Sequence, residues 1–299
     1  MTVRLGDNQY GKAQTHVVRV TKSGPKGSVH DIKDMTVTVA LAGDFADTHL
    51  TGDNSKVVPT DSQKNAVFAL AKDSPIGEIE DFALRLAHQF VRDHSSVRRA
   101  RVSIEEQPWA RITAGGKPHP HSFERSGSER RLTTVTCTRE TEWVVSGVTE
   151  LTLLKTTGSE FWGYPKDRYT TLPETNERVL ATALDARWRY ASEGGNLAAG
   201  VNWALSHVEA RRLIIETFAT KHSLSLQQTL FAMGEAVLEA RPEIAEIRFA
   251  MPNKHHFAVD LQPFGLENDN EVFYAADRPY GLIEGTVLRD DAEPADQAW

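Results

Sequence analysis

The sequence predicts an α+β fold made of two similar halves, and three observations support this prediction. Each half opens with two strand-like segments in which apolar and polar residues alternate. Two segments with apolar residues at helical spacing follow. Further strand-like segments close each half. This order favours an antiparallel sheet with its helices on one face. A sheet with open edges is incomplete alone, and we expect it to continue into another subunit.

The first half covers residues 1–141. Thr60 and Asp61 give a helix N-cap signal before the segment that begins at Ser62. A second helix is indicated by an apolar stripe made of Ile79, Phe82, Ala83, Leu86 and Phe90. The strand-like segments of this half are residues 16–21, 35–41, 97–106 and 119–140.

The second half covers residues 142–289 and repeats this order. The apolar face of its first helix is predicted to consist of Val201, Leu205, Val208, Ile215 and Ala219. That of its second helix is predicted to consist of Leu226, Leu230, Met233 and Val237. The strand-like segments are residues 144–154, 179–190, 246–251, 256–262, 271–276 and 280–288. Residues 290–299 are acidic and contain proline, which predicts a flexible tail.

Composition excludes several classes of protein. The chain has 299 residues, 25% of them charged, and no apolar run long enough to cross a bilayer. A net charge of −7 argues against a general nucleic-acid binder. Cys137 is the only cysteine, which excludes an internal disulfide and a CxxC motif. The N-terminus lacks a hydrophobic signal region, so we expect a cytoplasmic protein without membrane or nucleic-acid partners.

The most informative segment is the polar cluster at residues 253–256. Asn253, Lys254, His255 and His256 place an amide, an ammonium group and two imidazoles between two strand-like segments. Such a cluster is compatible with a solvated turn. It is also compatible with a site at the end of a strand, where these groups bind a ligand or move a proton.

Two segments of the first half carry groups of the same kind. Lys12 follows Gly11 at the start of a strand, where an exposed lysine is the ordinary alternative. Thr60 lies at a helix start, where backbone N–H groups point outward and attract an anion or a carbonyl group. Helix capping alone also explains Thr60.

Three segments of the second half add groups that suit a flat ligand. Phe161 belongs to an aromatic run between glycines, which is either a core anchor or a stacking platform. Gln227 lies at a helix start, where its amide offers one donor and one acceptor to a heterocycle. Arg178 lies in a strand-like run, and its planar fork suits an anionic oxygen if it faces a pocket rather than solvent.

Metal and nucleotide sites are not expected from the motifs. His119 and His121 have an HxH spacing, but neither HExxH nor a two-histidine, one-carboxylate pattern accompanies them. GxGxxG and GxxxxGK[ST] are both absent. We therefore expect no metal in the catalytic site.

Taken in order, these segments resemble the urate oxidase (uricase) family, and its bacterial members most closely. The resemblance covers nearly the whole chain. It is carried by residues 8–12 (Asn-Gln-Tyr-Gly-Lys), 60–65, 115–123, 153–163, 167–172, 252–257 (Pro-Asn-Lys-His-His-Phe), 260–262 and 271–273.

The resemblance implies a tunnelling fold (T-fold) with two tandem ββααββ units per chain, whose antiparallel sheets form a barrel across subunits. It implies a homotetramer with active sites at the subunit interfaces. It also implies an oxidoreductase in which urate reacts with O2 and water, giving 5-hydroxyisourate and hydrogen peroxide. No metal or organic cofactor is implied.

The resemblance also assigns roles to single residues. Lys12, Thr60 and His255 would be catalytic, with Lys12 and Thr60 relaying a proton. The substrate-binding residues would be Thr60, Asp61, Phe161, Arg178, Leu226, Gln227 and Asn253. Of these, Asp61 would contribute its backbone N–H from a neighbouring subunit.

Two alternatives remain open, and the chain departs from the family pattern at a few points. The alternatives are another T-fold enzyme acting on a pterin or related purine, often with zinc, and a purine-binding homologue without catalysis. Pro59 stands before Thr60 where a small residue is expected, and we predict that it stiffens this approach. The C-terminus lacks the peroxisomal Ser-Lys-Leu signal of eukaryotic members, in line with a cytoplasmic setting.

Overall fold

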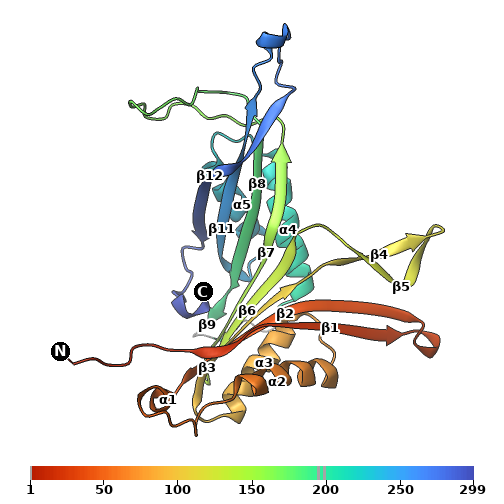
Figure 1. Ribbon diagram of the computed structural model, residues 1–299, viewed down its shortest axis with the longest axis vertical. Coiled ribbons are helices and arrows are strands. Elements are labelled where there is room, and N and C mark those ends of the chain that lie inside the picture. The colour runs from red at the N-terminus through yellow and green to blue at the C-terminus, as the bar shows by residue number, and fades with distance from the viewer. Residues whose placement is uncertain (1, 194–195, 198–199) are drawn as a thin grey trace. The chain divides into compact units, whose positions relative to one another are not determined.

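The computed structural model describes residues 2–193, 196–197 and 200–299 (Figure 1). The chain divides into two compact units, each with helices packed on antiparallel strands. Unit 1 consists of Met1–Gly147, Arg189–Ala204 and Glu293–Trp299, and unit 2 of Val148–Trp188 and Leu205–Ala292. The α+β prediction is confirmed, while the boundaries predicted after residues 141 and 289 stay a prediction. None of the described helices is long and apolar enough to cross a membrane.

The main sheet of unit 1 has the strand order β1-β2-β3-β6, with antiparallel pairing throughout. These strands are β1 (Tyr10–Ser23), β2 (Val29–Gly43), β3 (Val97–Glu106) and β6 (Arg130–Cys137). β7 (Glu142–Lys155) follows β6 and continues into unit 2. Two smaller pairs are β4 (Trp109–Ala114) with β5 (Lys117–Arg125), and β9 (Ser192–Glu193) with β10 (Asn196–Leu197).

Three helices belong to unit 1: α1 (Ala46–Leu50), α2 (Thr60–Asp73) and α3 (Ile79–Asp93). α2 packs on β1, and α3 packs on β3 and β6 (Figure 1). The apolar stripe predicted for α3 is confirmed, because all five of its residues are buried. Burial of this apolar stripe against the strands is the main interaction that stabilises the packing of α3 on the sheet.

In unit 2 the strands follow the order β7-β8-β11-β12. They include β8 (Leu180–Tyr190), β11 (Ile244–Ala258) and β12 (Phe273–Leu288), and the helices are α4 (Trp203–Thr220) and α5 (Leu226–Ala240). α5 packs on β11 and β12. Gly234 permits this contact, since a Cβ atom there would lie 2.5 Å from a methyl carbon of Val287.

The apolar face predicted for α4 is wrong. Leu205 and Val208 are exposed, and the buried side chains are instead Trp203, Ser206, His207, Ala210, Ile214 and Phe218. Both sets have helical spacing because α4 carries apolar residues on two sides. Periodicity finds such a helix but does not tell which side meets the sheet.

Residues 253–256 do not form a turn, which settles one alternative. β11 runs without interruption from Ile244 to Ala258, where the sequence suggested two separate strands. Its pairing with β12 shifts register between Asn253 and His255. Four residues of β12 (277–280) lie opposite the single residue Lys254 at this point, so the irregularity is in β12, and the polar cluster stays on a continuous strand beside it.

The C-terminal residues contact unit 1. Ala298 is buried, and its carbonyl oxygen accepts a hydrogen bond from Arg101 at 3.2 Å. The carbonyl oxygen of Glu293 accepts another from Arg189 at 3.0 Å. The flexibility predicted for residues 290–299 stays a prediction.

Candidate active site

A cavity of about 700 Å³ in unit 2 brings together six of the predicted site residues. They are Phe161, Arg178, Leu226, Gln227, Asn253 and His255. These residues come from the loop between β7 and β8, from the start of α5 and from the part of β11 beside its register shift with β12. Segments far apart in the sequence therefore meet around one hollow, as expected for a ligand site.

Arg178 is held in place by the loop that precedes it. Its Nε donates to Ser159 Oγ at 3.1 Å, and its backbone N–H donates to the carbonyl oxygen of Ser159 at 3.0 Å. The guanidinium carbon lies 5.2 Å from the centre of the Phe161 ring. Partial burial lowers the pKa of Arg178, yet a guanidinium stays charged at neutral pH. The site thus contains a positioned and partly desolvated cation.

A network of buried hydroxyl and backbone groups joins this loop to α5. The backbone N–H of Ser223 donates to Gly158 O at 2.9 Å, and that of Glu160 donates to Ser223 O at 2.7 Å. Thr229 Oγ1 donates to Ser223 Oγ at 2.7 Å. Because Ser159, Ser223 and Thr229 are fully buried, these hydrogen bonds fix the position of the loop relative to the start of α5.

Phe161 is only partly buried, so its interpretation as a core anchor is wrong, while the stacking platform stays a prediction. Its backbone forms a two-way bridge with Thr175, at 2.8 and 3.0 Å. Its ring stacks on Tyr164 with the centroids 4.9 Å apart, and it also lines the cavity. The backbone of Phe161 is therefore anchored, and the residue lines the cavity.

The two adjacent glutamines at the start of α5 have different environments. Gln228 completes a capping box: its backbone N–H donates to Ser225 Oγ at 3.1 Å, and its Oε1 accepts from Leu224 N–H at 2.9 Å. Gln227 is exposed and lines the cavity. The N–H groups of Leu226 and Gln227 have no acceptor one turn earlier in the helix, so this end favours an anionic ligand.

Beside the register shift of β11, Asn253 and His255 line the same cavity, whereas Lys254 does not. The rings of His255 and Phe257 stack with centroids 5.7 Å apart. Burial lowers the pKa of His255, and the nearby positive charges of Arg178 and His256 lower it further. These effects favour the neutral form of the His255 imidazole.

The other three predicted residues belong to unit 1. Lys12 is half-buried on β1 opposite Val39, beside a register shift between Lys12 and Thr15. Thr60 and Asp61 are exposed at the first two positions of α2. Asp61 has a lowered pKa, chiefly because of Lys64 and to a smaller extent because of Lys12. Lys12 is thus close enough to the start of α2 for their charges to interact.

The N-cap predicted at Thr60 and Asp61 is wrong by one position. Pro59 is the N-cap, with φ of −55°, and the helix begins at Thr60. The carboxylate of Asp61 instead accepts hydrogen bonds from Lys64 and Asn65 one turn later. Tyr10 anchors the approach to the helix, because its hydroxyl donates to Val58 O at 3.1 Å and accepts from Val58 N–H at 2.8 Å.

Several cavity residues escaped the sequence analysis. Thr175, Phe257, Asn270, Phe273 and Ile283 also line the hollow. Phe273 is placed there by strand pairing, opposite Ala258 in the neighbouring strand. Phe257 and Phe273 lie in segments that carry the family resemblance but received no role, whereas Thr175, Asn270 and Ile283 lie outside those segments.

Comparison with known proteins identifies the family. The model of the family described as Uricase matches residues 8–136 and 144–284. The uricase of Arthrobacter globiformis is 46% identical over 297 residues, which cover 99% of this chain and 94% of that protein. The chain belongs to the uricase family.

Other relatives support the uricase family assignment. The uricase of Cyberlindnera jadinii is 37% identical and covers 97% of this chain and 99% of its own length. The crystal structure of Arthrobacter globiformis uricase superposes with a TM-score of 0.92, covering 99% of this chain and 98% of that one. Urate oxidase from Bacillus sp. TB-90, at 24% identity and a TM-score of 0.80, shares the fold. The predictions of a T-fold and of an oxidoreductase of the urate oxidase family are confirmed.

Proposed function

We propose that this chain oxidises urate with O2 and water to 5-hydroxyisourate and hydrogen peroxide, without a metal or organic cofactor. The observation that carries the proposal is the composition of the unit 2 cavity. It presents a guanidinium, an exposed amide, an aromatic ring and a helix N-terminus to one hollow. Urate is a flat anion with donors and acceptors around its edge, and it needs one of each of these groups.

In the proposed complex, Arg178 and Gln227 hold one edge of urate, while Phe161 stacks on its face. The backbone N–H of Leu226 adds a donor at the helix start. The hydroxyl network behind Arg178 supports this grip, since it fixes the guanidinium before a ligand arrives. Asn253, beside the register shift, faces the position above the ring where O2 and then water bind.

The chemical step follows from the electronic structure of the reactants. Triplet O2 reacts slowly with closed-shell molecules, but a fully deprotonated purine is electron-rich enough to pass it an electron directly. The protein therefore has to remove a proton from urate and hold O2 over the ring. Atoms balance when one urate, one O2 and one water give one 5-hydroxyisourate and one hydrogen peroxide.

The proton path proposed here uses Lys12, Thr60 and His255. Lys12 accepts the proton through Thr60, whose hydroxyl both donates and accepts. His255 then takes the proton from the water that displaces peroxide from the ring. The lowered pKa of His255 supports this role, because the residue must be neutral to act as a base.

We further propose that the active site is shared between protomers of a homotetramer. Lys12, Thr60 and the backbone N–H of Asp61 would then complete the cavity of a neighbouring chain. The edge strands support assembly: Val18 and Val20 on β1, and Tyr274, Tyr280 and Leu282 on β12, are exposed apolar side chains. Open edges with apolar side chains favour pairing with another sheet, here into a barrel. The cytoplasmic location stays a prediction.

The decisive experiment measures urate oxidation by metal-free protein. After exhaustive chelation and a check of metal content, we expect loss of the urate absorbance band together with uptake of one O2 per urate. Activity that disappears on chelation and returns with zinc would favour the zinc-dependent pterin or purine enzyme. Tight binding of urate without any turnover would favour the non-catalytic binding protein.

A further inference from the structure

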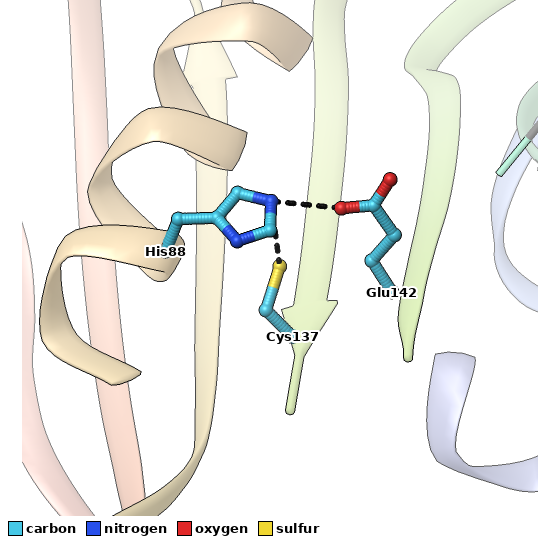
Figure 2. Close-up of side chains that lie close together, drawn as sticks. All are labelled: His88, Cys137 and Glu142. Carbon is cyan, nitrogen blue, oxygen red and sulfur yellow. Dashed lines mark hydrogen bonds and ion pairs between the residues drawn. The ribbon is translucent and has the colours of Figure 1, made fainter. Parts of the chain in front are cut away.

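Unit 1 contains a cluster of metal-ligating side chains that the proposed reaction does not use: His88, Cys137 and Glu142 (Figure 2). One candidate ligand atom from each residue lies within 4.8 Å of the other two. His88 Nε2 is 2.8 Å from Glu142 Oε2 and 4.0 Å from Cys137 Sγ. Across the described ranges, no other group of three such residues meets this spacing.

The geometry distinguishes a metal site from a nucleophilic cysteine site. In a cysteine–histidine–acid relay, the thiol and the carboxylate occupy opposite nitrogens of the imidazole ring. Here both groups approach the same nitrogen, Nε2 (Figure 2). One nitrogen, one sulfur and one oxygen atom therefore lie close together on one side of the ring, and a metal ion can bind such a set after small side-chain rotations. We propose that His88, Cys137 and Glu142 bind a zinc ion, with water as the fourth ligand.

The donor set and the spacings fit zinc. Tetrahedral zinc with one sulfur, one nitrogen and one oxygen ligand separates these donors by roughly 3.4–3.6 Å, from its usual bond lengths. The separations of 2.8 and 4.0 Å need small side-chain rotations to reach those values. A thiolate and a carboxylate together neutralise a divalent ion. The mixed sulfur and nitrogen donors favour zinc over magnesium or calcium.

Rigid elements position the three ligands. Cys137 ends β6 and Glu142 begins β7, so the two residues flank the short loop that connects these strands. Thr138 closes that connection: its N–H donates to Thr141 O at 2.8 Å, and its Oγ1 accepts from Thr141 N–H at 2.9 Å. Ligands on such elements keep their geometry without the metal.

The third ligand, His88, lies on α3, which a buried carboxylate ties to the same two strands. Glu80 on α3 is fully buried and lies 2.7 Å from a guanidinium nitrogen of Arg131 on β6. Its other oxygen accepts a hydrogen bond from Ser146 on β7 at 2.5 Å. The helix that carries His88 is therefore fixed to the strands that carry the other two ligands.

A metal ion has a path to this cluster. A cavity of about 470 Å³ lies beside it and is lined by His88 and Glu142. Cys137 is fully buried, whereas the His88 side chain is 51% exposed. Arg92 and Arg139 also line the cavity, but Arg92 pairs with Asp93 and Arg139 donates to a backbone carbonyl. The charge of Arg92 is thus paired with a carboxylate, and the guanidinium of Arg139 is directed to Ser95 O.

The thiol itself argues against an oxidation-sensitive or nucleophilic role. Burial, and to a lesser extent Glu142, raises the pKa of Cys137 to about 12. Without metal the sulfur stays protonated and inert. A bound zinc ion would displace that proton, as it does at other cysteine ligands.

The test uses untagged full-length protein, stripped of metal and titrated with Co²⁺ and then Zn²⁺. Because the chain has a single cysteine, a thiolate-to-cobalt absorption band can arise only from Cys137. We expect one equivalent of Co²⁺ to produce this band and one of Zn²⁺ to abolish it. Binding of Co²⁺ without the band would overturn the proposal.

Variants separate this cluster from adventitious metal binding. We expect His88→Gln and Glu142→Gln, both at solvent-accessible positions, to weaken Zn²⁺ binding more than about tenfold. Cys137→Ser should remove the cobalt band. A double variant at His119 and His121, whose rings lie 4.5 Å apart on β5, is the control and should bind as the unmodified chain does. Equal Zn²⁺ affinity in all variants would also overturn the proposal.

The zinc proposal is independent of the proposed urate chemistry. Metal-free protein should still oxidise urate, because none of the three ligands belongs to the proposed reaction path. Zinc should raise the thermal midpoint of the unmodified chain by selective binding to the folded state. Failure of the zinc-binding test therefore does not affect the proposal of urate oxidation, and failure of urate oxidation does not affect the zinc proposal.

Discussion

The two units place predicted catalytic residues at the same kind of backbone feature but in different surroundings. Lys12 on β1 and His255 on β11 each lie where an antiparallel ladder shifts register. His255 faces a cavity, and its pKa is lowered by burial. Lys12 is only half-buried, and the adjoining Thr60 and Asp61 are exposed. The two shifts differ: in unit 1 the extra residue lies on β1, beside Lys12, whereas in unit 2 the extra residues lie on β12, opposite the strand that carries His255.

From this difference in surroundings we predict that unit 2 contributes mainly to substrate binding and that Lys12 and Thr60 contribute mainly to the chemical step. The six predicted residues of unit 2 line one cavity within a single chain, so we expect them to determine the affinity for urate. Lys12 and Thr60 lack such an enclosure in the single chain, and we expect a neighbouring protomer to supply it. Variants of the two units should therefore change different kinetic constants.

The largest effect is expected from Lys12→Met. Removal of the proposed base should lower kcat by roughly 10²–10⁴-fold, while an unreactive urate analogue still binds. Lys22→Met, on the same strand, is the matched control. Steady-state urate oxidation and analogue titration measure the two quantities. Equal losses of turnover and analogue binding would assign Lys12 to substrate binding. The proposed difference in role between the two units would then be wrong.

Arg178→Lys should act on binding instead. Lysine keeps the charge but loses the planar fork, and a charge-assisted hydrogen bond contributes about 1.5–3 kcal/mol. We expect the analogue Kd to rise by roughly tenfold to a hundredfold, with kcat changed less. Arg168→Lys, in the same loop but outside the cavity lining, is the control. A fall in kcat at constant Kd would contradict this division of roles.

Pro59→Ala tests how the start of α2 is held in unit 1. Pro59 is the N-cap and limits the conformations of the unfolded chain. The free energy of unfolding should fall by about 0.4–1 kcal/mol, and the thermal midpoint should fall with it. Urate turnover should persist. An unchanged midpoint would show that proline does not stiffen the approach to Thr60.

The smallest effect is expected from His256→Gln, and it is measured as a shift in the pH dependence of kcat/KM. The positive charges of Arg178 and His256 add to burial in lowering the pKa of His255, so activity should persist below the usual histidine range. Removing His256 lets that pKa rise, and the acid limb of kcat/KM should move to higher pH by less than about one unit. His222→Gln is the control. A limb that stays in place would exclude coupling between the two histidines.

Local patterns predicted the elements of the fold better than their contacts. The α3 stripe was identified correctly because its apolar residues occupy a single side. α4 has two apolar sides, and the sequence analysis chose the wrong one. The polar cluster at 253–256 was recognised, but the continuous strand and its register shift depend on pairing with β12, which lies outside any local window.

The site shows the same limit. Six predicted residues line one cavity; Phe161, Asn253 and His255 belong to segments that carry the family resemblance, whereas Arg178, Leu226 and Gln227 lie outside those segments. The hydroxyl network behind Arg178 could not be predicted, because serine and threonine are common in loops and nothing local marks Ser159 and Ser223 as partners. Nor did the sequence connect His88 with Cys137 and Glu142, since helix packing sets that distance.

The solitary sulfhydryl of Cys137 gives unit 1 a built-in reporter. A thiol-reactive dye cannot reach this side chain while α3 covers the end of β6, so the labelling rate measures how often that region opens. No engineered cysteine is required, and unit 2 is not labelled because it contains no cysteine. Any partner molecule that clamps this corner would be detected as slower modification, at concentrations too low for calorimetry.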